Sequence, residues 1–242
     1  MKLLLTETLI ALKLSLRDRQ SFFWILLFPL LLLVLFVSAF GGGNPRTVSG
    51  VLSGVICISI FTGTLFGIGI VIASVRDEGI LRRYKIAPLP KWVFVFGMVM
   101  SRYIILLFSM AVLILAAELF YHIEIIGGGF PLFIVFSVGT ASFSALGFTI
   151  ASFSPTAQSA IAMANILLMP LIFLSGATIP RYILPVWINN IARFLPSTYL
   201  YDAFQEVIVF GGDLASIWVD LVVLVVFLIV AAALSIKLFR WE

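Results

Sequence analysis

The sequence predicts an all-α, polytopic membrane protein. Hydrophobic residues make up 62% of the 242-residue chain and charged residues only 11%, whereas soluble domains have about 45–50% apolar and about 25% charged residues. Several apolar runs also approach the roughly 20 residues that a helix needs to cross a bilayer. We therefore expect one transmembrane domain over residues 1–242, and we relate its net charge of +4 to lipid rather than nucleic acid.

Residues 1–20 are expected to form an amphipathic helix in the cytoplasmic headgroup region. Leu5, Leu9, Leu12 and Leu16 recur at helical spacing and share one face. Basic residues follow the first apolar residues and no small-residue cleavage site precedes the first span, so a signal peptide is not expected. The alternative is a helix packed against the bundle.

Six transmembrane helices fit the apolar runs that follow. Their expected ranges are Phe22–Phe40, Val51–Val75, Phe96–Phe120, Phe130–Phe153, Ser159–Leu174 and Ile217–Leu238. Pairs of small residues four apart, such as Gly50 with Gly54 and Gly63 with Gly67, lie in or beside several of these spans. Such spacing lets helix backbones approach closely. It indicates packing inside the bundle, although one such face could also serve a dimer.

The distribution of Lys and Arg predicts that both termini lie in the cytoplasm. The spans are expected in the plasma (cell inner) membrane. The segments assigned to the inside contain Lys2, Lys13, Arg17, Arg19, Arg76, Arg82, Arg83, Lys85, Lys91, Lys237 and Arg240. The outside segments contain only Arg46, Arg181 and Arg193. No Asp or Glu occupies the middle of a predicted span, which argues against transport driven by an ion gradient.

Arg102 is the charged residue that fits this scheme least well. A helix running straight from Lys91 would place it about 16 Å deep, where a charge is costly and usually functional. We favour the alternative in which Lys91–Val95 follows the interface and Arg102 reaches the inner membrane surface with its long side chain.

Residues 76–91 form the densest charged patch of the chain. Asp77 and Glu78 are expected at the start of a short helix, and Arg82 and Arg83 near its end, an order that complements the helix dipole. Pro88 and Pro90 prevent the helix from continuing. A compact amphipathic helix with a basic rim is therefore predicted, and the alternative is a basic loop bound to headgroups.

Residues 175–213 are too apolar for a freely solvated outer loop. Breakers at Pro180, Pro185 and Pro196 alternate with apolar residues, while Trp187, Tyr199 and Tyr201 suit an interfacial belt. One or two short helices that dip into the outer leaflet are expected, with Asn189, Asn190 and Arg193 toward water.

Two segments carry a family resemblance. Asp77–Leu81, read as Asp-Glu-Gly-Ile-Leu and followed by Ala87-Pro88, resembles the acidic-x-Gly-Thr-Leu…Ser/Thr-Pro segment of type-2 permeases of ATP-binding-cassette (ABC) exporters. Leu174–Pro180, Leu184–Trp187 and Leu195–Tyr199, with Asp202 and Ala203, resemble that family's segment between the last two spans. Ile80, Ala87 and Ser197 depart from the usual residues.

The resemblance implies the transmembrane permease subunit of an exporter for drug-like or lipid-like molecules, a multidrug efflux system, rather than an enzyme. The chain contains no GxxxxGK[ST] phosphate loop, so no cofactor is expected in it; ATP and magnesium would bind a separate ABC ATPase subunit. A second permease copy or a homologue would complete the path. The alternatives are a stand-alone secondary carrier or channel and a non-transporting membrane anchor.

Site residues follow from these expectations, and no metal site is expected. The residues predicted to couple to the ATPase are Asp77, Glu78, Gly79, Leu81, Arg82, Arg83 and Tyr84. Those predicted to line the translocation path are Thr62, Phe66, Met163 and Asn165. Those predicted to form an outer gate are Pro180, Pro185, Trp187, Pro196 and Tyr199.

Overall fold

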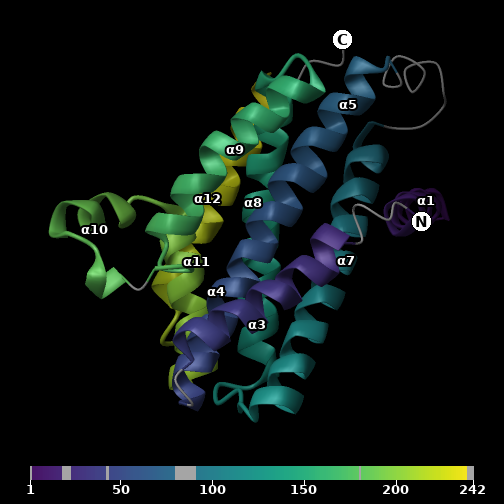
Figure 1. The fold of residues 1–242 in the computed structure, drawn as a ribbon. Coiled ribbons are helices and arrows are strands. Elements are labelled where there is room, and N and C mark those ends of the chain that lie inside the picture. The colour runs from purple at the N-terminus through teal and green to yellow at the C-terminus, as the bar shows by residue number, and fades with distance from the viewer. Residues whose placement is uncertain (1, 18–22, 42–43, 80–90, 180, 239–242) are drawn as a thin grey trace.

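The chain folds into an elongated bundle of helices (Figure 1). The computed structural model describes residues 2–17, 23–41, 44–79, 91–179 and 181–238, and within these ranges every regular element is helical. The elements are α1 Lys2–Arg17, η1 Phe23–Leu27, α3 Phe28–Phe40, α4 Pro45–Thr64, η2 Leu65–Ile70, α5 Val71–Asp77, α7 Lys91–Tyr121, α8 Gly129–Phe153, α9 Ala157–Leu174, η3 Arg181–Ile183, α10 Val186–Ala192, α11 Pro196–Gln205, η4 Glu206–Phe210 and α12 Trp218–Leu238.

A helix occupies each of the ranges predicted as spans. Five of these helices are long and apolar enough to cross a membrane: Pro45–Asp77, Val93–Tyr121, Gly129–Phe153, Ala157–Leu174 and Trp218–Leu238. The first predicted span contains the shorter apolar helix Ile25–Phe40. The chain is therefore a multi-pass membrane protein, as its composition predicted.

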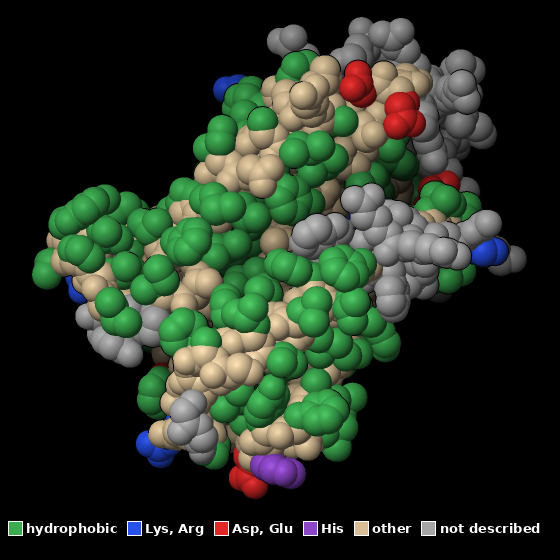
Figure 2. Space-filling model, in the orientation of Figure 1, with side chains coloured by type: hydrophobic (Ala, Val, Ile, Leu, Met, Phe, Trp, Pro, Cys, Tyr) green, Lys and Arg blue, Asp and Glu red, His purple; other side chains and the backbone are tan. Residues whose placement is uncertain are grey.

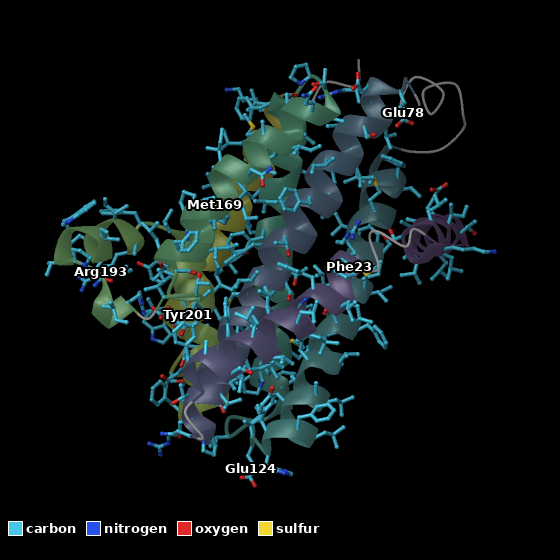
Figure 3. All side chains as sticks on the ribbon, viewed as in Figure 1. Phe23, Glu78, Glu124, Met169, Arg193 and Tyr201 are labelled. Carbon is cyan, nitrogen blue, oxygen red and sulfur yellow. The ribbon has the colours of Figure 1, made fainter. Side chains whose placement is uncertain are left out.

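Two helices are longer than the predicted spans inside them. Pro45–Asp77 has 33 residues and α7 has 31, so each measures roughly 45–50 Å at 1.5 Å per residue. The hydrocarbon core of a bilayer is only about 30 Å thick. Phe23 at the start of η1 lies part way along the bundle, whereas Glu78 beyond α5 lies at its end (Figure 3). The end that carries α5 therefore extends past the level at which the first apolar helix begins.

The amphipathic N-terminal segment forms α1 and packs against α7 (Figure 1). A Cβ atom added to Gly97 of α7 would lie 3.1 Å from Glu7 Cβ and 3.4 Å from the Thr8 backbone nitrogen. The absence of a side chain at position 97 thus allows the two helices to touch. The helix is confirmed, and its position in the headgroup region stays a prediction.

Pro29 shapes the start of the first apolar helix. Proline has no N–H to donate to the carbonyl four residues earlier, which here belongs to Ile25. The Ser109 Oγ of α7 donates to the Ile25 carbonyl at 2.7 Å. A backbone acceptor that would otherwise be costly in a membrane is satisfied, and the same bond fastens η1 to α7.

Most buried hydroxyls in the bundle are satisfied by helix backbones. Ser53, Ser59 and Thr64 each donate to the carbonyl four residues earlier, a pattern that lets helices carry hydroxyls in apolar surroundings. Ser142 of α8 also donates to the Leu224 carbonyl of α12 at 2.9 Å. These bonds add polar links to an apolar core whose largest contributions come from α4, α7 and α8.

The small residues of the predicted spans pack inside the chain. Gly63 faces the Leu106 side chain, whose Cδ2 would lie 2.5 Å from an added Cβ atom. Ala160 and Ala164 of α9 are both fully buried. The prediction of internal packing is therefore confirmed at these positions.

An apolar band covers the middle of the visible face of the molecule (Figure 2). Charged side chains on that face gather at the two ends of the bundle, on α1 and beside α10 (Figure 2). Large side chains of α3, α9 and α12 remain exposed, among them Leu35, Ile166 and Ile229. Lipid or protein must cover such faces, because contiguous apolar surface of this extent is not stable in water.

Candidate functional site

The charged segment after the second span begins on α5. Arg76 and Asp77 are the last residues of that helix and Glu78 is its C-cap. The prediction that Asp77 and Glu78 begin a helix is therefore wrong. The helix ends here because Gly79 adopts a φ of +71°, a left-handed conformation that glycine accepts without a Cβ penalty.

The rest of the predicted coupling helix lies outside the described residues. Leu81, Arg82, Arg83 and Tyr84 fall within 80–90, so their contacts stay predictions. Of the described members, Asp77 and Glu78 are exposed and Gly79 is half-buried. Among the described residues, nothing lies within 4 Å of a Cβ atom added at Gly79.

Arg76 and Asp77 contact the turn between α8 and α9. The Arg76 guanidinium donates to the carbonyl of Ser154, the C-cap residue of α8. Asp77 Oδ2 accepts from the backbone N–H of Ala157, the first residue of α9, at 3.4 Å. The Glu78 carboxylate accepts from Ser74 Oγ of its own helix at 3.0 Å. All three charged residues at this end are thus bonded within the chain, two of them to the α8–α9 turn.

Arg102 is buried against the middle of the second span. Its side chain is only 6% exposed, and its Nη2 donates to the Gly67 carbonyl at 3.1 Å. Gly67 lies in η2, a π-helical segment, and a Cβ atom there would lie 2.4 Å from the guanidinium carbon. The expected interfacial run Lys91–Val95 is instead the start of one continuous helix. The favoured prediction for Arg102 is wrong, because a bare backbone at Gly67 gives its charge a partner inside the bundle.

The four predicted path residues have different surroundings. Thr62 is half-buried and donates to the Ile58 carbonyl at 2.8 Å, while Phe66 and Met163 are half-buried against the apolar core. Asn165 is exposed on α9, and its amide donates to the Ile161 carbonyl of the same helix at 3.0 Å. The helices that carry these residues are in contact, since α9 packs on η2 and α4.

The outer segment contains the short helical elements η3, α10, α11 and η4, where one or two short helices were predicted. Their insertion into the outer leaflet stays a prediction. Pro185 is the N-cap of α10 and Pro196 lies in the first turn of α11, both positions that tolerate the missing N–H. Trp187 is 66% exposed on α10, which projects from the side of the bundle together with Arg193 (Figure 3). The Tyr199 hydroxyl donates to the Arg193 carbonyl at 2.9 Å. Pro180 lies outside the described residues.

Two of the expected water-facing or interfacial residues are instead bonded inward. Asn189 Nδ2 donates to the Arg181 carbonyl at 2.9 Å and to the Leu184 carbonyl, so its amide ties η3 to α10. Tyr201 Oη accepts from Gln205 Nε2 at 2.6 Å. Burial raises the pKa of the Tyr201 phenol to about 12, and the hydroxyl therefore keeps its proton at neutral pH.

A polar cluster fixes the outer segment to the second span. Arg181 forms an ion pair with Asp202 of α11, and Gln205 Nε2 donates to the Gly50 carbonyl of α4 at 3.3 Å. Burial raises the pKa of the Asp202 carboxyl, and the charge of Arg181 opposes that shift. Gly54 of α4 permits the closest approach, because a Cβ atom there would lie 2.2 Å from the Ala177 carbonyl oxygen.

Comparison with known protein families identifies the family of the chain. The family model described as ABC-2 type transporter matches residues 3–209. The chain belongs to the ABC-2 type transporter family. The resemblance drawn from the motifs of the sequence is confirmed.

This ABC-2 type chain is similar to proteins from two bacterial genera, at low identity. The "Probable multidrug ABC transporter permease YbhR" of Escherichia coli strain K12 is 23% identical over 178 residues, which are 74% of this chain and 48% of that protein. The "Nodulation protein J" of Rhizobium leguminosarum bv. viciae is 28% identical over 106 residues, 44% of this chain and 40% of that protein. The chain thus spans about half the length of the curated relatives it matches.

Several contacts of this ABC-2 type fold were not foreseen as site features. Arg181, Gln205 and the carbonyl of Ser154 have no signature of their own in the sequence. The spacing of Gly50 with Gly54 and of Gly63 with Gly67 did mark the second span as a close-packing helix. Among the described residues, no group of three or more His, Cys, Asp or Glu side chains is arranged to hold a metal ion.

Proposed function

We propose that the chain is the permease subunit of an ATP-driven exporter, with ATP and magnesium bound by a separate ABC ATPase subunit. The family match over residues 3–209 carries this proposal. It is supported by the charged end of α5, which leaves Glu78 exposed beside a segment that resembles the family's coupling helix. The similarity to a probable multidrug permease supports an amphipathic or hydrophobic substrate.

A second permease copy or a homologue completes the path in this proposal. Asn165 supports it: the amide is exposed on α9 among apolar neighbours such as Ile166 and Met169. A polar side chain is costly against lipid and favourable where another helix offers hydrogen-bonding groups. In this arrangement the chain spans a plasma membrane, and the charged end of α5 and both termini lie on its cytoplasmic side. The polar cluster of Arg181, Asp202 and Gln205 closes the outer end of the translocation path.

Co-purification tests the partner. The tagged chain, solubilised from its native membrane, is expected to retain an ABC ATPase subunit that mass spectrometry identifies. Transport of a cationic dye such as ethidium by the purified chain alone, with no ATPase present, would favour a stand-alone carrier or channel and contradict the proposal.

Glu78→Arg tests the coupling surface. Glu78 is exposed and its only described bond is to Ser74, so the variant is expected to insert normally. Reversing the charge should lower ATP-dependent ethidium efflux by about tenfold or more, because charge reversal at an interface costs several kcal/mol. Ser74→Ala removes the same intrahelical bond without reversing charge and is the matched control. Unchanged efflux in Glu78→Arg would contradict the assigned role.

A further inference from the structure

The end of α5 and the turn between α8 and α9 meet through complementary charges. A helix C-terminus carries unpaired carbonyls and partial negative charge, and a helix N-terminus carries unpaired N–H groups and partial positive charge. Arg76 donates to the Ser154 carbonyl at the end of α8, and Asp77 accepts from the Ala157 N–H at the start of α9. Cation and anion each meet the helix end of opposite sign.

The environment makes the arginine contact the stronger of the two. Ser154 is only 2% exposed, so water has little access to its carbonyl, and a charged hydrogen bond there is worth more than one at the surface. Asp77 is exposed, and solvent screens its contact. The α9 helix has a capping box of its own, formed by Thr156 and Ser159, so Asp77 is not needed merely to start the helix.

We propose that Arg76 and Asp77 are positioning residues that make the end of α5 and the α8–α9 turn one mechanical unit, so that a displacement of α5 also moves α9. This inference rests on the proposed function for the source of the displacement. A push on the segment after Asp77 would then reach two spans of the chain instead of one. The proposal also assigns Asp77 to a contact within the chain rather than to a contact with the ATPase.

A charge swap tests the unit in the complete complex of chain and ATPase subunit. Arg76→Asp combined with Asp77→Arg keeps the composition and net charge but places each charge against the helix end of like sign. The reporter is Ala162→Cys, an exposed position on α9, in a Cys57→Ala background. Maleimide labelling of that cysteine is measured with and without trapping of the ATPase by ATP and vanadate.

Trapping should change the labelling rate of the unswapped reporter by about threefold or more, as expected when the majority conformation changes. In the swap variant this change should vanish while nucleotide trapping continues. An equal change in both proteins would overturn the inference. If the native chain retains no ATPase at all, the proposed function fails instead, so the two failures are distinguishable.

A disulfide provides the second test, and it does not depend on the folding of the swap variant. In Asp77→Cys combined with Ala157→Cys, oxidation would fix the joint covalently. If the joint stays closed through the cycle, the response of the Ala162→Cys reporter to trapping is the same before and after oxidation. Loss of that response on oxidation and its return on reduction would show that the joint must open, and would overturn the inference.

Discussion

At the residue scale, Arg102 and Gly67 show how a charge is accommodated inside the bundle. The guanidinium occupies the space where a side chain at position 67 would lie, with its carbon 2.4 Å from an added Cβ atom. A buried charge must find a partner, and here a backbone carbonyl of the π-helical segment supplies it. π-Helical turns inside longer helices are often found at functional sites.

Gly67→Ala is expected to destabilise the chain by about 1–3 kcal/mol, because overpacking displaces the guanidinium from its carbonyl partner. Thermal unfolding of the purified chain in detergent measures the effect. Gly129→Ala is the control, since a Cβ atom at Gly129 meets nothing within 4 Å. Equal melting temperatures for Gly67→Ala and the unaltered chain would contradict this account.

The two tyrosines of α11 predict different responses to loss of their hydroxyls. Tyr201→Phe removes the acceptor for the Gln205 amide, which also donates to the Gly50 carbonyl, and should cost about 1 kcal/mol. Tyr199→Phe removes only an exposed bond to the Arg193 carbonyl and should cost less. Thermal unfolding in detergent compares the two variants. A larger loss of stability in Tyr199→Phe than in Tyr201→Phe would contradict this prediction.

At the element scale, the outer short helices are held in place by the second span rather than by their own propensity. The helix α10 has seven residues, and isolated helices of that length are not stable in water. The backbone around Ala177 reaches α4 only because Gly54 has no side chain. Asn189, Arg181 and Gln205 then fasten the segment through hydrogen bonds and an ion pair.

Gly54→Ala is therefore expected to loosen the outer segment. The obstructing atom would be a backbone oxygen, which cannot move aside without moving the whole segment. Limited proteolysis at the exposed bonds around α10 should become faster than in the unaltered chain. Gly50→Ala is the control, because a Cβ atom at Gly50 would lie 3.2 Å from the flexible Gln205 side chain instead of a backbone oxygen. The protease should cut this variant more slowly than Gly54→Ala. Faster cutting of Gly50→Ala would contradict this explanation.

At the scale of the whole molecule, the arrangement of the ends predicts the topology. Glu78 and Glu124 lie at opposite ends of the bundle (Figure 3), and both are exposed. In intact cells a membrane-impermeant maleimide should label Glu124→Cys and leave Glu78→Cys unlabelled, while inside-out vesicles should give the opposite result. The native Cys57 is fully buried and provides an unreactive background. Labelling of Glu78→Cys in intact cells would show that the chain has the opposite orientation in the membrane.

The predictions from the sequence succeeded where a property depends on a run of neighbouring residues. The apolar runs located the spanning helices to within a few residues at most ends, because hydrophobic length and breakers act locally. They placed the start of the second helix at Val51 rather than Pro45, although Pro is favourable in the first turn of a helix. The joint between Arg76 and Ser154 could not be foreseen, because its acceptor is a backbone carbonyl.

By itself, the sequence determined that this chain is a bundle of apolar helices of the ABC-2 type family, with a charged segment after the second span and short helices before the last. Composition, breaker positions and motif residues are local, and they are sufficient for that. Only the tertiary structure decided which groups meet: Arg102 with the Gly67 carbonyl, Gly54 with Ala177, and Arg76 with the end of α8. The reason is that at least one partner in each pair is a backbone group. Every residue has such groups, and only the packing of the helices decides which of them are available.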